Sequence, residues 1–182
     1  MTNMKGLHEI RGGIFNHHLL ACKRFVCAEV VALGDNWWAL ALARELDDAI
    51  LHLRANEDQI GTWLFTSEGS LDYVEQTDAL LEELRDDWFV REVRLYLKRV
   101  LKRLDVSSRS LIAAIGPGSC FAGTLLEIPL ACDQVFMLDG DYEGDPRPPA
   151  EIRLSAMNFG AYPQVNGLTR LASRFLGEPE IP

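Results

Sequence analysis

The sequence predicts an α/β fold with a largely parallel β-sheet, and three observations lead to this class. Short apolar runs alternate with segments in which apolar residues recur every three or four positions. Stretches rich in Gly, Pro and Ser separate these segments, as loops separate helices from strands. The 182 residues are 48% apolar and 25% charged, which is the composition of a folded domain with a real core. Strands that alternate with helices typically form a parallel sheet covered by helices.

The first 34 residues follow no clear period, and we interpret residues 1–34 as an irregular N-terminal segment with one strand at Phe25–Leu33. Residues 35–182 form the domain. Its first helix begins near Trp37, with Asp35 or Asn36 as N-cap, and its apolar positions continue to Leu53. The run Ile60–Thr66 is rich in aromatic and β-branched residues and predicts a short buried strand.

The remaining elements follow in alternation. Apolar periodicity predicts one helical region from Thr77 to Leu104, with an acidic first half and a basic last half, which suits the helix dipole. We then expect strands at Ser110–Ile115, Gln134–Leu138 and Glu151–Leu154, a helix from Gly123–Thr124 to Cys132, and a last helix over Gln164–Phe175.

Charge and hydropathy exclude some classes of function. Eighteen basic and 27 acidic residues give a net charge of −9, so a nucleic-acid partner is not expected. No apolar run reaches the roughly 20 residues of a membrane span, and the N-terminus does not resemble a signal peptide. Four sparsely spaced cysteines do not form a disulfide framework, which favours the cytoplasm.

No metal or cofactor site is predicted. The acidic loop Asp139–Asp145 departs from a calcium loop, because Glu143 is too long for its position and Ala150 replaces the bidentate glutamate. The set His17, His18, Cys22 and Cys27 lacks zinc-ligand spacing. Cys120 has no histidine nearby in sequence and is interpreted as a packed thiol.

The most informative segment is Gly116–Asp133, which predicts a strand, a Gly-rich turn and the start of a helix near Gly123 and Thr124. Unpaired N–H groups at such a helix N-terminus bind anions, or a carbonyl oxygen that gains negative charge. Glu127 lies about one turn further on, where it could move a proton beside that oxygen. The alternative is that the glycines only make a tight turn and that Glu127 caps or decorates the helix.

Two motifs in this order resemble the crotonase (enoyl-CoA hydratase/isomerase) superfamily. They are Leu-Ala-Cys-Asp at 130–133 and the segment Phe159-Gly160-x-Tyr-Pro163-x-x-x-Gly167-x-x-Arg170-Leu171. The resemblance implies the layered ClpP/crotonase fold, with a mostly parallel sheet and flanking helices. The chain ends before the helices that usually complete this fold, so we expect a fold that is incomplete at the C-terminus.

Further segments resemble the benzoyl-CoA-dihydrodiol lyase family, in particular its second crotonase-like half. These segments are residues 43–50, 105–111, 117–124 and 157–163, within a resemblance that covers about residues 37–177. The family degrades aromatic compounds as CoA thioesters: it opens the ring of a benzoyl-CoA dihydrodiol with water and releases formate. The resemblance implies an aromatic acyl-CoA thioester as substrate, no further cofactor, and a homo-oligomer.

The family's site residues carry over only in part. Thr124 falls on the second oxyanion donor and Glu127 on the first catalytic glutamate, but Ala156 falls on the second glutamate. The segment Ser67–Tyr73 lacks the first oxyanion pattern, and Pro129 replaces the usual alanine. We therefore expect a degenerate half that is inactive alone. Two alternatives are a hydratase or isomerase with Glu127 as sole base, and a non-catalytic module for CoA-thioester binding or oligomerisation.

Overall fold

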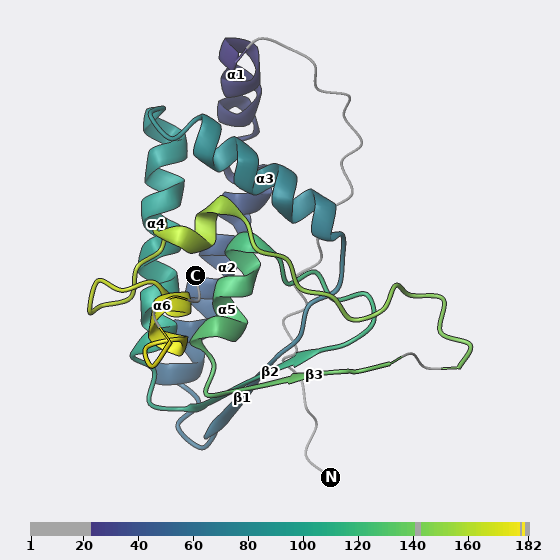
Figure 1. Cartoon of the computed structure of the whole chain (residues 1–182). Helices are drawn as coiled ribbons and strands as arrows, with labels where there is room; N and C mark the ends of the chain where they lie inside the picture. The colour runs from purple at the N-terminus through teal and green to yellow at the C-terminus, as the bar shows by residue number, and fades with distance from the viewer. Residues whose placement is uncertain (1–22, 141–142, 179, 181–182) are drawn as a thin grey trace.

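A computed structural model describes residues 23–140, 143–178 and 180, and its helices lie on one side of a small sheet (Figure 1). The helices are α1 (Lys23–Leu33), α2 (Trp38–Ala55), α3 (Leu71–Glu83), α4 (Trp88–Asp105), α5 (Gly123–Ala131) and α6 (Arg170–Arg174). The strands are β1 (Thr62–Phe65), β2 (Ser110–Ile115) and β3 (Gln134–Met137), and two 3₁₀ turns span Gly34–Asn36 (η1) and Ala156–Phe159 (η2).

The three strands form one parallel sheet in the order β1-β2-β3, so the predicted α/β class and the parallel pairing are confirmed. On β2, Leu111, Ala113 and Ile115 are buried under the helices, and the residues between them are less buried. Leu64 on β1 is 64% exposed, and every residue of β3 is exposed. The sheet is therefore covered by helices on one face, while much apolar surface of β1 and β3 stays open.

Helix α5 lies in the middle of the helical layer and is the element that positions the candidate site. Its residues from Gly123 to Pro129 are all buried, and it contacts α3, α4, α6 and η2. The β2 strand leads into it through the turn at 116–122, as the sequence predicts. Because α5 is surrounded on all these sides, any polar group on it must find its partners inside the protein.

Two predictions at the N-terminal end are wrong. The strand expected at Phe25–Leu33 is part of helix α1, which satisfies its own backbone groups and does not join the sheet. Neither Asp35 nor Asn36 is the N-cap of α2, because both belong to η1 and Trp37 takes that position without a side-chain cap.

The region predicted as one helix over 77–104 is two helices. Helix α3 ends at Glu83, and Asp87 starts α4 by accepting hydrogen bonds from the backbone N–H groups of Phe89 and Val90 at 2.9 and 3.2 Å. The side chain of Asp87 therefore fixes the start of a second helix, although the apolar period continues across the break. The acidic half of the predicted helix thus belongs to α3, and α4 is basic from its first turn.

The C-terminal elements are shorter than the sequence indicates. The strand expected at Glu151–Leu154 is not formed; its backbone makes one isolated bridge, between Arg153 and Ala122. The last helix spans Arg170–Arg174 only, and η2 was not predicted. Within the described residues, no helix is both long and apolar enough to cross a membrane.

Candidate functional site

The N-terminus of α5 is where the sequence places an oxyanion site, and it is built around a close approach of Asp78 from α3. Gly123 has φ of +41°, a conformation that favours glycine. A Cβ at this position would collide with the Asp78 carboxylate and would lie 2.5 Å from Ser155 Oγ. Glycine is therefore required here for backbone geometry and for the space that Asp78 occupies.

The predicted oxyanion donors already have partners within the protein. The Thr124 N–H donates to Asp78 Oδ2 at 2.9 Å, and the Gly123 N–H donates to the carbonyl of Arg153 at 2.9 Å. The hydroxyls of Thr124 and Ser155 also donate to the Asp78 carboxylate, at 2.5 and 2.6 Å. The carboxylate of Asp78 thus takes the position at the helix N-terminus where a substrate oxygen would bind.

Asp78 is 3% exposed, and burial raises the pKa of its carboxyl group above the ordinary value, although three hydrogen bonds from Ser155 and Thr124 act against the shift. The folded state therefore holds this proton more tightly than the unfolded chain does. Its contribution favours folding at low pH and is lost as the pH rises from about 3.8 through the raised pKa. Its partners are neutral groups, so the charge is stabilised by hydrogen bonds and by the helix dipole.

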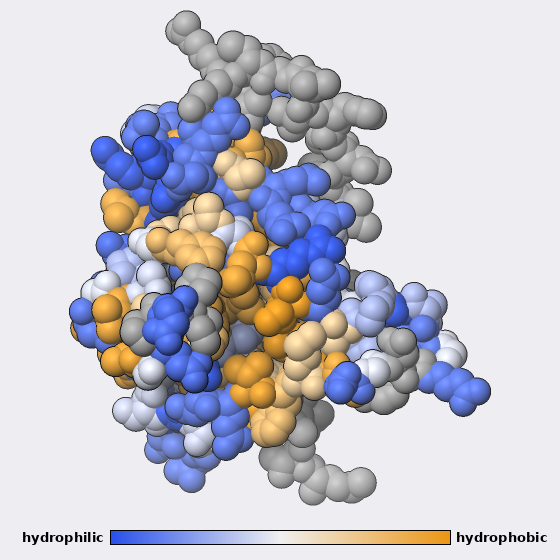
Figure 2. Space-filling model, viewed as in Figure 1, coloured by the Kyte–Doolittle hydropathy of each residue, from blue (hydrophilic) through white to orange (hydrophobic). Residues whose placement is uncertain are grey.

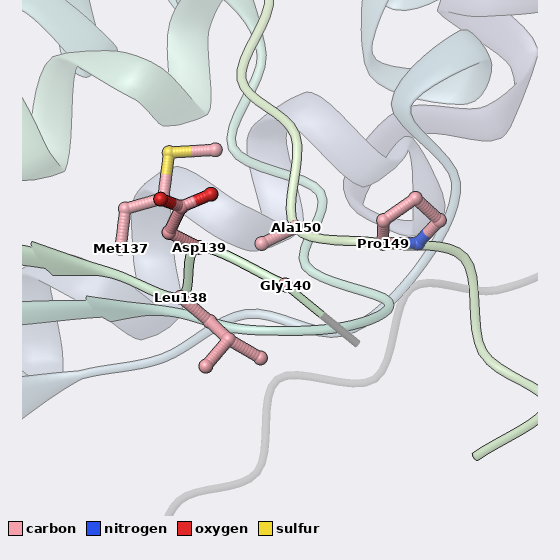
Figure 3. A pocket seen from close by; sticks show the side chains of 6 residues that line it. All are labelled: Met137, Leu138, Asp139, Gly140, Pro149 and Ala150. Carbon is pink, nitrogen blue, oxygen red and sulfur yellow. The ribbon is translucent and has the colours of Figure 1, made fainter. Parts of the chain in front are cut away.

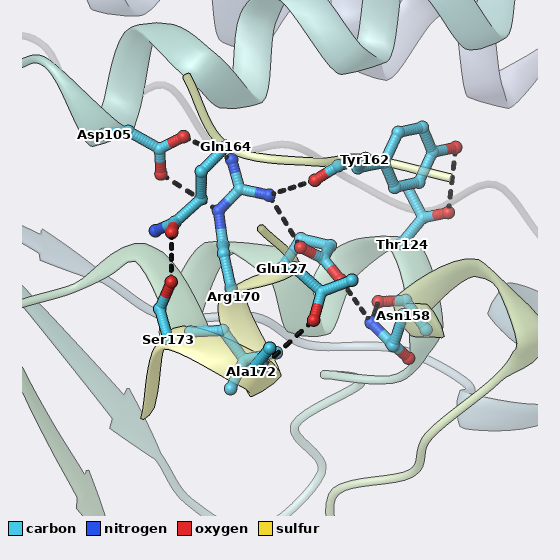
Figure 4. A network of polar contacts seen from close by, with 12 residues as sticks. Asp105, Thr124, Glu127, Asn158, Tyr162, Gln164, Arg170, Ala172 and Ser173 are labelled. Atoms are coloured by element: carbon cyan, nitrogen blue, oxygen red, sulfur yellow. Dashed lines mark hydrogen bonds and ion pairs between the residues drawn. The ribbon is translucent and has the colours of Figure 1, made fainter. Parts of the chain in front are cut away.

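Glu127, the predicted catalytic acid or base, is 2% exposed, and both of its oxygens are bonded (Figure 4). Asn158 Nδ2 donates to Oε1 at 2.7 Å, and Arg170 Nη1 donates to Oε2 at 2.7 Å. Burial raises the pKa of Glu127, while the contacts with Asn158 and Arg170 oppose the rise. A proton transfer to any substrate would first have to break these contacts.

Arg170 is the centre of the network around Glu127, and its side chain is completely buried. It binds Asp105 through two hydrogen bonds, Nε to Oδ1 at 3.0 Å and Nη2 to Oδ2 at 2.8 Å. Its Nη1 also donates to the carbonyl of Tyr162 at 2.9 Å. This single cation ties α4, α5 and α6 to the loop that carries Tyr162.

The other positions of the family pattern also lack a site. Ala156, which the resemblance aligns with a second glutamate, stands at the start of η2 and carries only a methyl group. In the segment Ser67–Tyr73, Ser67 Oγ accepts from the Cys120 N–H at 3.0 Å, and the Gly69 N–H donates to the Gly118 carbonyl at 3.1 Å. In this segment, where the resemblance would place the first oxyanion donor, Ser67 and Gly69 instead hold the turn at 118–120 in place.

One cleft lies at the end of β3 and does not involve these residues. A cleft of about 480 Å³ is lined by Met137, Leu138, Asp139, Gly140, Pro149 and Ala150, at the end of β3 and in the loop that follows (Figure 3). Neither Glu127 nor Thr124 lines it. In the described part of the chain no three His, Cys, Asp or Glu side chains are grouped to hold a metal, while His17, His18, Cys22 and Asp141 lie outside the described residues.

Sequence reasoning named Glu127 but missed its partners and the role of Asp78. The partners of Glu127, which are Arg170 and Asn158, lie in the segments that carry the family resemblance, and so does Asp105, the second partner of Arg170. The motifs therefore included these residues but did not indicate what they do. Asp78 lies in no such segment, and its contact with Thr124 joins residues 46 positions apart.

A comparison with proteins of known function tests the resemblance that the sequence motifs indicate. Over 151 residues, the chain is 53% identical to benzoyl-CoA-dihydrodiol lyase from Aromatoleum evansii. The chain is similar to benzoyl-CoA-dihydrodiol lyase. The match covers 83% of this chain and 26% of that protein, so the chain spans about a quarter of its relative's length. No family model matches the chain. The predicted resemblance to benzoyl-CoA-dihydrodiol lyase is thereby confirmed.

Proposed function

We propose that this chain forms a crotonase-like, non-catalytic part of a benzoyl-CoA-dihydrodiol lyase-type enzyme of aromatic degradation. The 53% identity to that lyase supports the assignment of the enzyme. The whole enzyme would open the ring of an aromatic dihydrodiol CoA thioester. In it, this part would serve packing and assembly rather than chemistry.

The observation that carries the non-catalytic role is the occupied N-terminus of α5. An oxyanion site must present free N–H groups to a developing negative charge. Here the Thr124 N–H is bonded to Asp78, and the Gly123 N–H is bonded to the Arg153 carbonyl. The only carboxylate that the family pattern leaves, Glu127, is held by Arg170 and Asn158.

The alternative of a hydratase or isomerase with Glu127 as sole base needs the opposite arrangement. Glu127 would have to reach a substrate, which requires that it leave Arg170 inside the core. Breaking a buried ion pair costs about 3–5 kcal/mol, and this cost would be added to the activation barrier. We therefore propose a structural role for Glu127, which fixes α5 against α6.

We also propose that the chain assembles, either with a second copy or with the rest of a lyase. Apolar side chains gather over the middle of the face seen in Figure 2. Large exposed apolar residues include Leu64, Val135, Phe136, Met137, Ile152 and Leu154. Exposed apolar surface on this scale marks sites of association. Sedimentation of the purified chain should show a species larger than a monomer; a monomer at all concentrations would contradict self-assembly.

The cytoplasm is the compartment that we propose. Among the cysteines whose side chains the structure describes, Cys120 and Cys132 are free, buried thiols. This agrees with a reducing environment.

Thermal unfolding with benzoyl-CoA and with free CoA tests the proposed absence of a thioester site. The two ligands share their phosphates and differ in the thioester and the ring. A thioester site filled at 100 times its dissociation constant would stabilise the chain by about 2.7 kcal/mol. We expect the same melting temperature with both ligands. A higher melting temperature with benzoyl-CoA, abolished by Glu127→Gln, would refute the non-catalytic role.

A further inference from the structure

We propose that a basic cleft on α4 binds the phosphate group of an organic anion. The cleft has a volume of about 260 Å³ and lies between the turn after α3, residues 91–98 of α4 and the loop after η2. It is lined by Arg85, Asp86, Arg91, Arg94, Leu95, Lys98 and Ala161. None of these residues was singled out as a site by the sequence, and none belongs to the network around Glu127.

The cleft is cationic in a protein that is strongly acidic overall. The chain carries a net charge of −9, yet four of the seven lining residues are Arg or Lys and one is acidic. Arg85 and Arg94 share one carboxylate, that of Glu82, at 2.7 and 3.0 Å. One carboxylate cannot neutralise two guanidinium groups, so positive charge remains at this wall.

The other two cations are even less neutralised. Arg91 lies 3.8 Å from Glu92, and both of these side chains are 61% exposed, so the pair is weak. Among the described residues Lys98 has no ion pair. Arg91 and Lys98 are therefore available to an anion. Beside them, Arg85 and Arg94 share the single negative charge of Glu82.

The positions of these cations on α4 favour one shared ligand. Arg91, Arg94 and Lys98 follow each other at three- and four-residue steps, so they lie on one face of the helix. Arg91 is in the first turn, where the helix dipole makes a cation unfavourable and an anion favourable. A bound anion would relieve this repulsion and gain from both the side chains and the dipole.

The composition of the wall selects the chemistry of the ligand. A phosphate carries up to two charges and several acceptor oxygens, so it can bridge two or three cations, which one carboxylate does less well. Leu95 and Ala161 add an apolar wall beside the charges, suited to the organic part of the ligand. This inference is independent of the proposed lyase function, because it uses no residue of the thioester site.

Calorimetric titration of the 182-residue chain at low salt tests the proposal, with inorganic pyrophosphate and adenosine 3′,5′-bisphosphate as probes. The test variant is Arg91→Ala/Lys98→Ala. The matched control is Arg99→Ala/Lys102→Ala, which removes one Arg and one Lys from the same helix outside the cleft. We expect the test variant to weaken binding at least tenfold and the control to weaken it less than twofold. Far-UV circular dichroism would verify that both variants are folded.

Each outcome decides the question. Binding of both probes indicates a site for phosphate itself, and binding of the adenosine compound alone indicates a site that also needs the organic group. In both cases salt should weaken the binding, since the cations are solvent-exposed. No binding of either probe, or equal weakening by the two variants, would overturn the proposal. In the thermal unfolding test, a larger rise in melting temperature with benzoyl-CoA than with CoA concerns the thioester site only. The proposed function and the proposed phosphate site can therefore fail separately.

Discussion

Replacing Arg170 with Met should destabilise the fold more than any surface change, because it leaves two buried carboxylates without their cation. The Arg170 side chain is fully buried, and its partners Glu127 and Asp105 are 2% and 8% exposed at their side chains. Removing one partner of a buried ion pair costs about 3–5 kcal/mol. For a chain of this size that corresponds to a fall in melting temperature of roughly 6–20 °C. Met keeps most of the side-chain volume, so the loss measures charge and hydrogen bonding rather than a cavity.

The assay is urea unfolding followed by tryptophan fluorescence, for which the chain has four Trp residues. Arg91→Met is the matched control, since that side chain is 61% exposed, and its effect should stay within about 0.5 kcal/mol. The double variant Glu127→Gln/Arg170→Met should lose at least about 1 kcal/mol less than the two single losses added together, because it removes an orphaned charge. An Arg170→Met variant within about 1 kcal/mol of the parent protein would refute the account of the network.

Three further predictions follow from the same core. The midpoint of unfolding should fall as the pH rises above about 4, and Asp78→Asn should flatten this slope, because burial raises the pKa of Asp78 in the folded state above its ordinary value of 3.8. Gly123→Ala should lower the free energy of unfolding by at least about 2 kcal/mol, since φ is positive and the Cβ meets the Asp78 carboxylate. Gly61→Ala is the control: open space surrounds Gly61, so the change should be less than about 0.5 kcal/mol. In a variant whose two N-terminal cysteines are replaced by serine, Cys120 and Cys132 should react with a thiol reagent only after unfolding, because both are buried and burial raises the pKa of Cys132 to about 12.

Each of these has a contrary result. An unchanged pH slope in Asp78→Asn would show that burial does not raise the pKa of Asp78 in the folded state. Equal stabilities of the Gly123 and Gly61 variants would show that Asp78 does not fill the space at α5. Rapid thiol reaction in the native state would contradict the packing around these cysteines.

The sequence predicted the fold best where burial on one face is strongly patterned. The predicted bounds of β2, Ser110–Ile115, agree with the structure. Alternate residues of this strand face the helices, and the flanking Gly and Ser residues end the run. Helix α5 was also placed correctly, since the Gly-rich turn precedes a continuous apolar segment. The break between α3 and α4 was missed because apolar residues keep the helical period across it, and only the capping of Phe89 and Val90 by Asp87 shows it.

The site could be only half predicted, for a physical reason. Local spacing identifies which residues sit at the start of a helix, so Gly123, Thr124 and Glu127 were found. What these residues do depends on partners from distant parts of the chain. Arg170 is 43 positions from Glu127, and Asp78 is 46 positions from Thr124. No period or spacing encodes such contacts, so the sequence could not distinguish an open oxyanion site from one filled by an internal carboxylate.

Turnover of a benzoyl-CoA dihydrodiol thioester is the measurement that tests the central claim most directly. It would compare the chain with its Glu127→Gln variant, after circular dichroism has shown that both are folded. The account predicts no rate above the uncatalysed background for either protein, because the N–H groups at α5 and both oxygens of Glu127 have internal partners. Turnover by the parent chain that Glu127→Gln abolishes would contradict it.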